Sequence, residues 1–305
     1  MNEIPCEHLI FAGNGMAGVA CVDELLKSRQ DFDITVFGCE PYTNYDRALL
    51  PSVLAGERDT ESITLNDIEW YQEHAIRTRL GIRVEEIDRG ARSVRSSDGD
   101  WTSYDELILA TGASPAIPVA GGLDKDGVFV FSTLEDTRNI MEAALPGTRA
   151  AVIGGWLAAE AARALRKRGC DVVIIDSEES PAQQIDRVLG ERRAEAVRFR
   201  NGVEFGADLV VIANNLVPNT ALAREAGLEV NRGIVVNDRM ETSDPYIFAI
   251  GACTEHNGRT YEYFPPLLEQ AKVLAANLAG MRGRGFADLD TVFQELASPL
   301  HQRAE

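Results

Sequence analysis

The stretch His8-Leu9-Ile10-Phe11-Ala12-Gly13-Asn14-Gly15-Met16-Ala17-Gly18 decides the fold. An apolar, strand-like run leads directly into a complete G-x-G-x-x-G pattern, and an amphipathic helix pattern follows it. In a dinucleotide-binding βαβ unit the first glycine permits the tight turn. The second lets the backbone approach a pyrophosphate, and the third lets helix and strand pack closely. Because the phosphates lie at the helix N-terminus, this arrangement predicts a dinucleotide site, whereas isolated glycines would indicate only a flexible turn.

The sequence after this helix supports the prediction. A second apolar run, Ile34 to Phe37, ends near Glu40, an acidic residue of the kind that binds an adenosine ribose. Glu40 lies 27 positions after Gly13, more than the roughly 20 of the simplest pattern. The polar connection over residues 28–31 accounts for the difference.

A second copy of the pattern is degenerate. The run Ala151-Val152-Ile153 leads into Gly154-Gly155-Trp156-Leu157-Ala158-Ala159, where two of three glycines are missing. The next strand, over residues 171–175, ends at Asp176. We interpret Gly154, Gly155, Trp156 and Asp176 as a candidate NAD site, in which Trp156 stands at the second glycine position and would obstruct a pyrophosphate. The alternative is that Trp156 is a packing residue that fills an emptied cleft.

Composition narrows the class of protein. The chain has 305 residues, a net charge of -18 and 45% hydrophobic residues, which indicates about two globular domains. The negative charge argues against nucleic acid and against an anionic membrane surface. Without an apolar run of about 20 residues or a basic leader, we expect a cytoplasmic protein with no membrane insertion. Five cysteines without a C-x-x-C pair predict neither a disulfide framework nor a metal site.

The alternation of strand and helix patterns predicts an α/β fold with two Rossmann-like, three-layer domains. We expect helices over residues 66–74, 185–196 and 267–278, and one more amphipathic helix over residues 289–296.

Several motifs follow one another in a specific order. They are the first glycine motif, Glu40-Pro41, Tyr45-Asp46-Arg47, Glu69-Trp70-Tyr71, Tyr104-Asp105 before Leu109 to Gly112, Val217-Pro218-Asn219, and Thr242 to Pro245 before Phe248 to Gly251. This set resembles the FAD-dependent pyridine nucleotide oxidoreductases over about residues 9–280. Residues 33–145 look closest to the flavin module at the start of the NAD(P)H-dependent nitrite reductase large subunit, and to the rubredoxin reductases.

The resemblance implies a domain plan. It implies a discontinuous FAD-binding domain over residues 1–118 and 243–285, with an inserted NAD(P)-binding-like domain over residues 119–242 and a C-terminal tail over residues 286–305. Residues 177–207 form a shorter stretch than the resemblance predicts, so we expect a reduced second domain.

The resemblance also implies site residues. Those implied to bind FAD are Gly13, Asn14, Gly15, Met16, Ala17, Gly18, Glu40, Arg47, Val84, Ala110, Thr111, Gly112, Gly251, Ala252, Pro266 and Gln270. Ala252 replaces an acidic residue of the family, and Glu160 matches a glutamate near the nicotinamide and flavin. No protein side chain is expected to be catalytic, because the flavin carries the chemistry. Other interpretations stay open: a surface ion pair for Arg47, a strand cap for Thr111 and a solvated helix position for Gln270.

The implied function is electron transfer through FAD between NADH and a separate protein acceptor of the iron-sulfur or rubredoxin type. The alternative is a flavoprotein subunit, or FAD-binding interaction module, that exchanges electrons only through a partner chain or a larger redox complex. Asp176 favours NADH, because the 2′-phosphate of NADPH would meet a carboxylate. Thiol-dependent members of the family carry a cysteine just after the Tyr-Asp-Arg stretch, but residues 48–51 contain none. The resemblance therefore disfavours disulfide reduction. The sequence contains no siroheme or iron-sulfur module, so we do not expect it to reduce nitrite by itself. The oligomeric state is left open.

Overall fold

The computed structural model describes residues 6–28, 31–176, 184–261 and 264–281. The chain divides into two compact units. Unit 1 comprises Met1–Tyr45, Leu65–Ala113 and Pro218–Glu305, and unit 2 comprises Asp46–Thr64 and Ser114–Val217. Each contains a parallel sheet with helices, so the predicted α/β class is confirmed.

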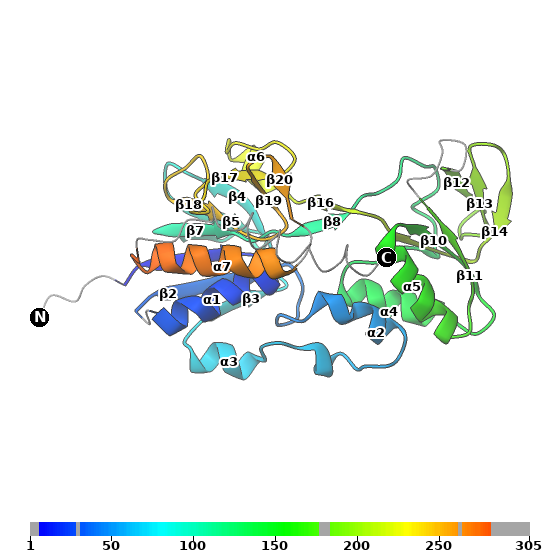
Figure 1. Ribbon diagram of the computed structural model, residues 1–305, viewed down its shortest axis with the longest axis horizontal. Helices are drawn as coiled ribbons and strands as arrows, with labels where there is room; N and C mark the ends of the chain where they lie inside the picture. Colours follow the sequence, from blue (N-terminus) through cyan, green and yellow to red (C-terminus); the bar gives the residue numbers. More distant parts are fainter. Residues whose placement is uncertain (1–5, 29–30, 177–183, 262–263, 282–305) are drawn as a thin grey trace, which may run out of the picture. The chain divides into compact units, whose positions relative to one another are not determined.

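Unit 1 is built on a five-stranded parallel sheet in the order β18-β7-β1-β2-β3 (Figure 1). Its strands are β1 (His8–Ala12), β2 (Asp33–Gly38), β3 (Arg77–Leu80), β7 (Glu106–Leu109) and β18 (Ile247–Ala249). Helix α1 (Met16–Ser28) connects β1 to β2. The carboxyl ends of parallel strands share one edge of the sheet, which is where ligands of such folds bind.

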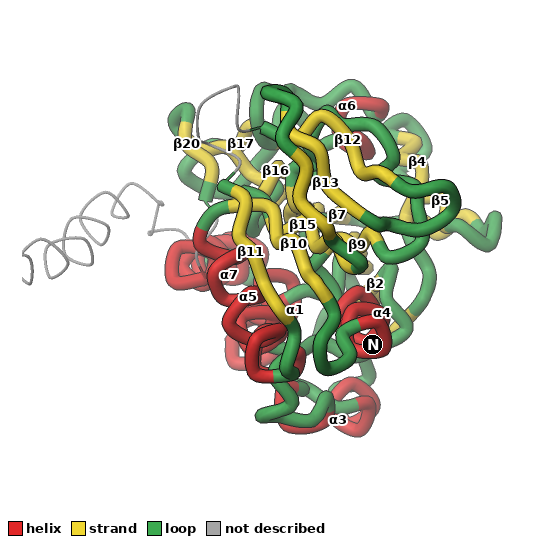
Figure 2. Tube along the Cα trace, turned by 90° about the vertical axis from the view of Figure 1, so that its right-hand side faces the viewer, coloured by secondary structure: helices red, strands yellow, loops and turns green. Residues whose placement is uncertain are grey.

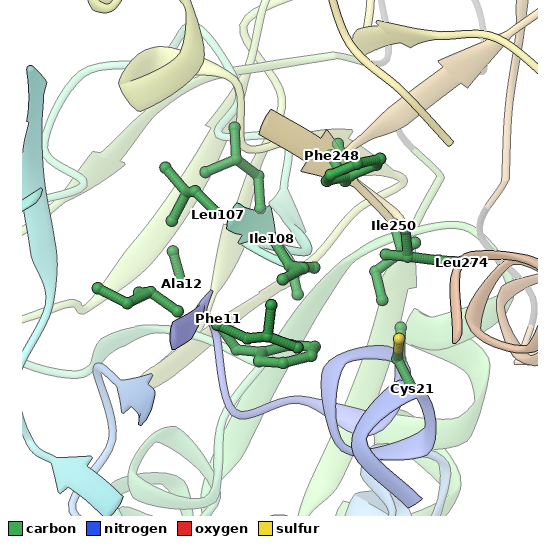
Figure 3. Packing of buried hydrophobic residues seen from close by; sticks show 14 of the residues in the cluster. Phe11, Ala12, Cys21, Leu107, Ile108, Phe248, Ile250 and Leu274 are labelled. Atoms are coloured by element: carbon green, nitrogen blue, oxygen red, sulfur yellow. The ribbon is translucent and has the colours of Figure 1, made fainter. Parts of the chain in front are cut away.

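The core of unit 1 surrounds this sheet. Leu9, Ile10 and Phe11 are all fully buried, as expected for a central parallel strand that is covered on both faces. Figure 3 shows Phe11 and Ile108 in one packed cluster with Cys21 of α1 and Leu274 of α7 (Phe264–Leu278). Helix α7 packs along α1.

Two small sheets and two short helices complete the described part of unit 1. The antiparallel sheet contains β4 (Val84–Asp88), β5 (Ser93–Ser96) and β6 (Trp101–Ser103). The mixed sheet contains β17 (Ile234–Val236), β19 (Thr254–His256) and β20 (Arg259–Thr260). The helices are α3 (Ile68–Glu73) and α6 (Ala221–Glu225).

Unit 2 contains a four-stranded parallel sheet in the order β11-β10-β15-β9 (Figure 2). Its strands are β9 (Val128–Val130), β10 (Arg149–Gly154), β11 (Asp171–Ile175) and β15 (Leu209–Ala213). Helix α5 (Trp156–Lys167) connects β10 to β11. Helix α2 (Leu50–Leu54) packs against both α5 and α4 (Leu134–Ala143) in the same unit. An antiparallel sheet of β12 (Ile185–Leu189), β13 (Ala196–Phe199) and β14 (Glu204–Gly206) shares a core with the parallel sheet.

The helix predicted over residues 185–196 is wrong. This segment forms β12 and the start of β13, joined by a turn at Gly190. Gly190 has a φ of +123°, and a Cβ there would lie 2.0 Å from the carbonyl oxygen of Arg193. Local helix propensity is overruled here because Val188 and Val197 pack in the core against the parallel sheet.

Two other helices differ from prediction only at their ends. The helix predicted over residues 66–74 spans Ile68–Glu73, and the one predicted over 267–278 begins earlier, at Phe264. The helix predicted over residues 289–296 lies outside the described residues. None of the helices in the described ranges has the length and apolarity needed to cross a membrane.

The two units have different bounds from the expected domains. Residues 46–64 group with unit 2 and residues 218–242 group with unit 1. The short strands β8 (Ala113–Pro115) and β16 (Leu216–Pro218) pair with each other at the two points where the chain passes between the units.

Candidate functional site

The three glycines of the first turn have different surroundings. Gly13 has a φ of +136°, and a Cβ on it would lie 2.1 Å from the carbonyl oxygen of Ala110. A Cβ on Gly18 would lie 2.7 Å from the carbonyl oxygen of Gly13. A Cβ on Gly15 would meet nothing within 4 Å. Packing therefore requires Gly13 and Gly18, whereas the open space at Gly15 fits the approach of a pyrophosphate.

The backbone around this turn is well fixed. Gly13 N donates to Phe37 O at 2.9 Å, and Val19 N donates to Gly15 O at 3.1 Å, the first bond of α1. The N–H groups of Met16, Ala17 and Gly18 thus fall in the first turn of the helix, where backbone donors lack helical acceptors. Together with the helix dipole, these donors can hold an anion.

Glu40 and Val84 belong to the same unit, Glu40 just after β2 and Val84 at the start of β4. Glu40 follows β2, which pairs with β1, so it lies at the same sheet edge as the glycine turn. Its carboxylate accepts a hydrogen bond from the Tyr45 hydroxyl at 2.7 Å. Val84 is buried and begins β4, and the Gly81 N–H donates to Glu40 O at 2.9 Å.

The turn over Ala110, Thr111 and Gly112 follows β7 directly, and Asn219 closes it. The Thr111 hydroxyl donates to Asn219 O at 2.7 Å, and Asn219 Nδ2 donates to Thr111 O at 2.9 Å. Asn219 N also donates to Gly112 O at 2.9 Å. Thr111 is therefore a cross-link to a distant segment and not a strand cap. The Val217-Pro218-Asn219 motif signalled this segment, but sequence reasoning gave Asn219 no role.

Gln270 anchors the turn after β18. It is 0% exposed, so the solvated interpretation is wrong. Its Oε1 accepts from Gly251 N at 2.7 Å, and its Nε2 donates to Thr254 Oγ1 at 3.0 Å. The half-buried Ala252 lies in this turn, and Pro266 is buried in the first turn of α7.

Arg47 belongs to unit 2, whereas the residues described above belong to unit 1. Its Nη1 donates to Ser132 O at 2.8 Å, and Ser132 immediately precedes the N-cap of α4. This contact is to a carbonyl oxygen of the same unit.

The second glycine turn is one residue shorter than the first. Gly154 matches Gly13: its φ is +143°, and a Cβ would lie 2.1 Å from Ala213 O. Ala159 N donates to Gly155 O at 3.2 Å, as Val19 N does to Gly15 O. Gly155 is therefore the N-cap of α5 in the position of Gly15, and no residue corresponds to Asn14. The prediction that Trp156 stands at the second glycine position is wrong, because it matches Met16.

Trp156 is also not a packing residue. Its exposed fraction is 61%, which rules out an indole that fills a buried cleft. Ala158 takes the place of Gly18 and is fully buried. The N-terminus of α5 has no side-chain cap among the described residues, so its backbone donors fit an anionic ligand.

Asn214 is a site residue that sequence reasoning missed. It directly follows β15 and is 7% exposed. Its backbone N lies so close to Gly154 that a Cβ added to that glycine would be 2.9 Å away. Its Nδ2 donates to Ala116 O at 2.7 Å, whereas its buried Oδ1 has no partner in the described ranges. A ligand that carries a hydrogen-bond donor would satisfy this oxygen.

The remaining candidate residues of unit 2 lie on two elements. Asp176 is exposed at the end of β11, the strand that pairs with β10, and so lies at the same sheet edge as Gly154. Glu160 is on α5 and forms an ion pair with Arg163 at 3.2 Å. Over the described residues, no cluster of histidine, cysteine and carboxylate side chains could hold a metal ion.

Known proteins are similar to this chain in sequence and in fold. The family of pyridine nucleotide-disulphide oxidoreductases matches residues 7–205 and 183–273. The assimilatory nitrate reductase electron transfer subunit of Bacillus subtilis (strain 168) is 42% identical, over 90% of this chain and 39% of that protein. A nitrite reductase [NAD(P)H] of the same organism is 40% identical, over 92% of this chain and 38% of the relative.

A solved structure gives the same result. The putidaredoxin reductase of a covalent complex with putidaredoxin superposes with a TM-score of 0.82 and 31% identity, over 90% of this chain and 75% of that one. The chain thus spans less than two fifths of the length of the two Bacillus relatives but three quarters of the solved reductase. With a family match across most of its length, the chain belongs to the pyridine nucleotide-disulphide oxidoreductase family.

Proposed function

We propose that this protein is an FAD flavoprotein that moves electrons between NADH and a separate protein acceptor of the iron-sulfur or rubredoxin type. The observation that carries the proposal is the first glycine turn. Gly13 and Gly18 are fixed by packing, while Gly15 leaves open space beside the N-terminus of a 13-residue helix. This combination is what a pyrophosphate needs.

The residues of unit 1 have distinct roles in this proposal. Backbone N–H groups of residues 15–18 hold the pyrophosphate, and Glu40 accepts from the adenosine ribose. The turns over residues 110–112 and 251–252 form the flavin end, with Gln270 fixing the second of them. FAD supplies hydride acceptance and release of one or two electrons, and the protein supplies binding and orientation.

NADH is the proposed donor, and unit 2 is its proposed site. The N-terminus of α5 would hold the NADH phosphates, Asn214 Oδ1 would accept a hydrogen bond, and Asp176 would favour the free ribose hydroxyl of NADH over a 2′-phosphate. Glu160 is a candidate neighbour of the nicotinamide.

A second candidate function is a flavoprotein subunit that receives its electrons only through a partner chain. The shortened turn at Gly154 and Gly155 favours it. This turn has one residue fewer than the first, so its backbone does not offer a pyrophosphate the same set of groups. A relative that carries the name electron transfer subunit also supports it.

An anaerobic titration separates the two functions. We expect purified protein to carry FAD and its visible band to bleach on addition of NADH. Bleaching by dithionite but not by NADH would instead establish the subunit function. A protein that cannot be reconstituted with FAD would contradict both.

A cytoplasmic location is part of the same proposal. All five cysteines lie in described segments and are free thiols, which suits a reducing compartment.

A further inference from the structure

The Glu69-Trp70-Tyr71 motif has no role in the function proposed so far, yet the structure connects it to the FAD turn. Tyr71 lies on α3 and is 1% exposed. Its hydroxyl donates to Asn14 Oδ1 at 2.8 Å, 57 positions away in the sequence. Asn14 is the residue between Gly13 and Gly15, so this contact reaches the centre of the turn.

The rest of α3 fixes the position of this hydroxyl. The Asp67 side chain caps the helix by accepting from Trp70 N at 2.9 Å. The Trp70 ring packs edge-on against the Tyr71 ring, with centroids 5.0 Å apart. Tyr71 O accepts from Ile76 N at 2.9 Å, at the turn into β3.

Asn14 is held from several sides. It packs so closely on Gly38 that a Cβ added to that glycine would lie 2.9 Å from the Cβ of Asn14. Its Nδ2 donates to Tyr42 O at 3.4 Å. The Tyr71 hydroxyl has a second, longer contact with Asn44 Oδ1 at 3.2 Å. Because the hydroxyl has one proton, the shorter contact makes Asn14 its main acceptor.

We propose that Tyr71 is a positioning residue for the FAD pyrophosphate: its hydroxyl holds the Asn14 amide, and thereby orients the peptide groups on both sides of Asn14 toward the phosphates. This inference rests on the proposed FAD function. A turn that is fixed before binding loses less freedom when the ligand arrives, so it binds more tightly.

The tyrosine hydroxyl suits this role over the whole physiological pH range. Burial raises the pKa of Tyr71 to about 12, so the group stays protonated and remains a donor. The second turn of the chain has no counterpart of Asn14, so this clamp belongs to the FAD turn alone within the described residues.

The test is the FAD affinity of full-length protein in which Tyr71→Phe keeps the ring but removes the hydroxyl. We expect the FAD dissociation constant, measured by quenching of flavin fluorescence, to rise about 3- to 10-fold. The matched control is Tyr104→Phe. Tyr104 is also buried in unit 1, with 4% exposed, and its charged neighbours are Asp88, Arg89, Arg92 and Asp244. It precedes β7, which runs parallel to β1, so it lies at the sheet edge opposite to the turn. We expect this variant to bind FAD as the wild type does.

A double-mutant cycle separates positioning from general structural support. Asn14→Ala removes the acceptor, so adding Tyr71→Phe to it should change the dissociation constant by less than about twofold. Additive losses in the double variant, or wild-type affinity in Tyr71→Phe, would overturn the positioning role. If Tyr71→Phe does not fold, the affinity of Asn14→Ala decides the question, and wild-type affinity would overturn the role. Wild-type protein that binds no FAD would overturn the proposed function as well.

Discussion

Gly15 differs from the other two glycines of its motif because no protein atom crowds the position that a side chain would take there. A Cβ there meets no protein atom within 4 Å, whereas Gly13 and Gly18 each lie too close to a carbonyl oxygen to carry one. The motif predicts a tight turn at Gly13 and close packing at Gly18, and the contacts of both glycines agree with these roles.

Gly15→Ala should therefore leave the protein folded and remove its cofactor. We expect the free energy of unfolding of the FAD-free protein to change by less than about 1 kcal/mol, and FAD affinity to fall at least about tenfold. Urea unfolding and flavin fluorescence measure the two effects. Gly13→Ala is the contrasting variant, since it should fail to fold stably. Equal loss of stability in both variants would contradict this distinction.

The buried hydrogen bonds of Gln270 should contribute both to stability and to FAD binding. Gln270→Leu leaves the Gly251 N–H without its acceptor and Thr254 Oγ1 without its donor in a buried position. We expect the free energy of unfolding to fall by about 1 to 3 kcal/mol, together with weaker FAD binding. Glu269→Gln on the same helix removes a partly exposed ion pair with Lys272 and should cost less than about 1 kcal/mol. Similar losses in the two variants would disprove the buried role.

Among elements, strands β1 and β10 could be predicted from sequence, whereas strand β12 could not. Residues 8–12 and 149–154 are apolar runs followed by glycines, and both form the expected strands. Residues 185–196 contain charged residues and alanine at spacings that favour a helix, but Val188 and Val197 join a core formed with distant strands. That packing is absent from any local window of sequence. The missing residue in the second turn was visible in the sequence, yet its effect on register needed the α5 hydrogen bond from Ala159 to Gly155.

Helix α4 gives the prediction at this scale. Thr133 Oγ1 accepts from Asp136 N at 3.0 Å, and Asp136 Oδ2 accepts from the N–H groups of Thr133 and Ser132, which forms a capping box. Thr133→Ala should lower the free energy of unfolding by about 0.5 to 2 kcal/mol, as measured in urea. Thr133→Ser keeps the oxygen and should retain most of that stability. A Thr133→Ala protein with unchanged stability would argue against this cap.

For the whole molecule, acid should destabilise both units. Hydrogen bonds from neighbouring residues, several of them cationic, lower the pKa of six carboxyl groups: Glu57, Asp59, Asp98, Asp186, Asp208 and Glu255. Since the folded-state pKa lies below the unfolded one, the unfolded chain binds more protons as the pH falls. Their contribution is fully present above about pH 4.5 and is lost below it.

Urea unfolding at pH 5.5 and pH 3.5 measures this loss. We expect a lower free energy of unfolding at pH 3.5. In Asp208→Asn, which removes the carboxylate paired with Arg149 at 2.6 Å, we expect a smaller dependence on pH. A variant with the full wild-type dependence would show that this pair does not contribute.

The discontinuity of unit 1 affects the order in which the two units can fold during synthesis. The FAD turn at residues 13–18 leaves the ribosome early, but the edge strand β18 and the helix α7 that packs on α1 come from residues 247–278. All of unit 2, residues 46–64 and 114–217, is translated in between. The usual order, in which the N-terminal domain folds first, is therefore reversed. Unit 2 can fold before β18 and α7 are synthesised, and until then the apolar surface of β1 and α1 stays partly uncovered. We therefore expect nascent chains stalled before residue 247 to bind chaperones more strongly than chains that extend beyond residue 278.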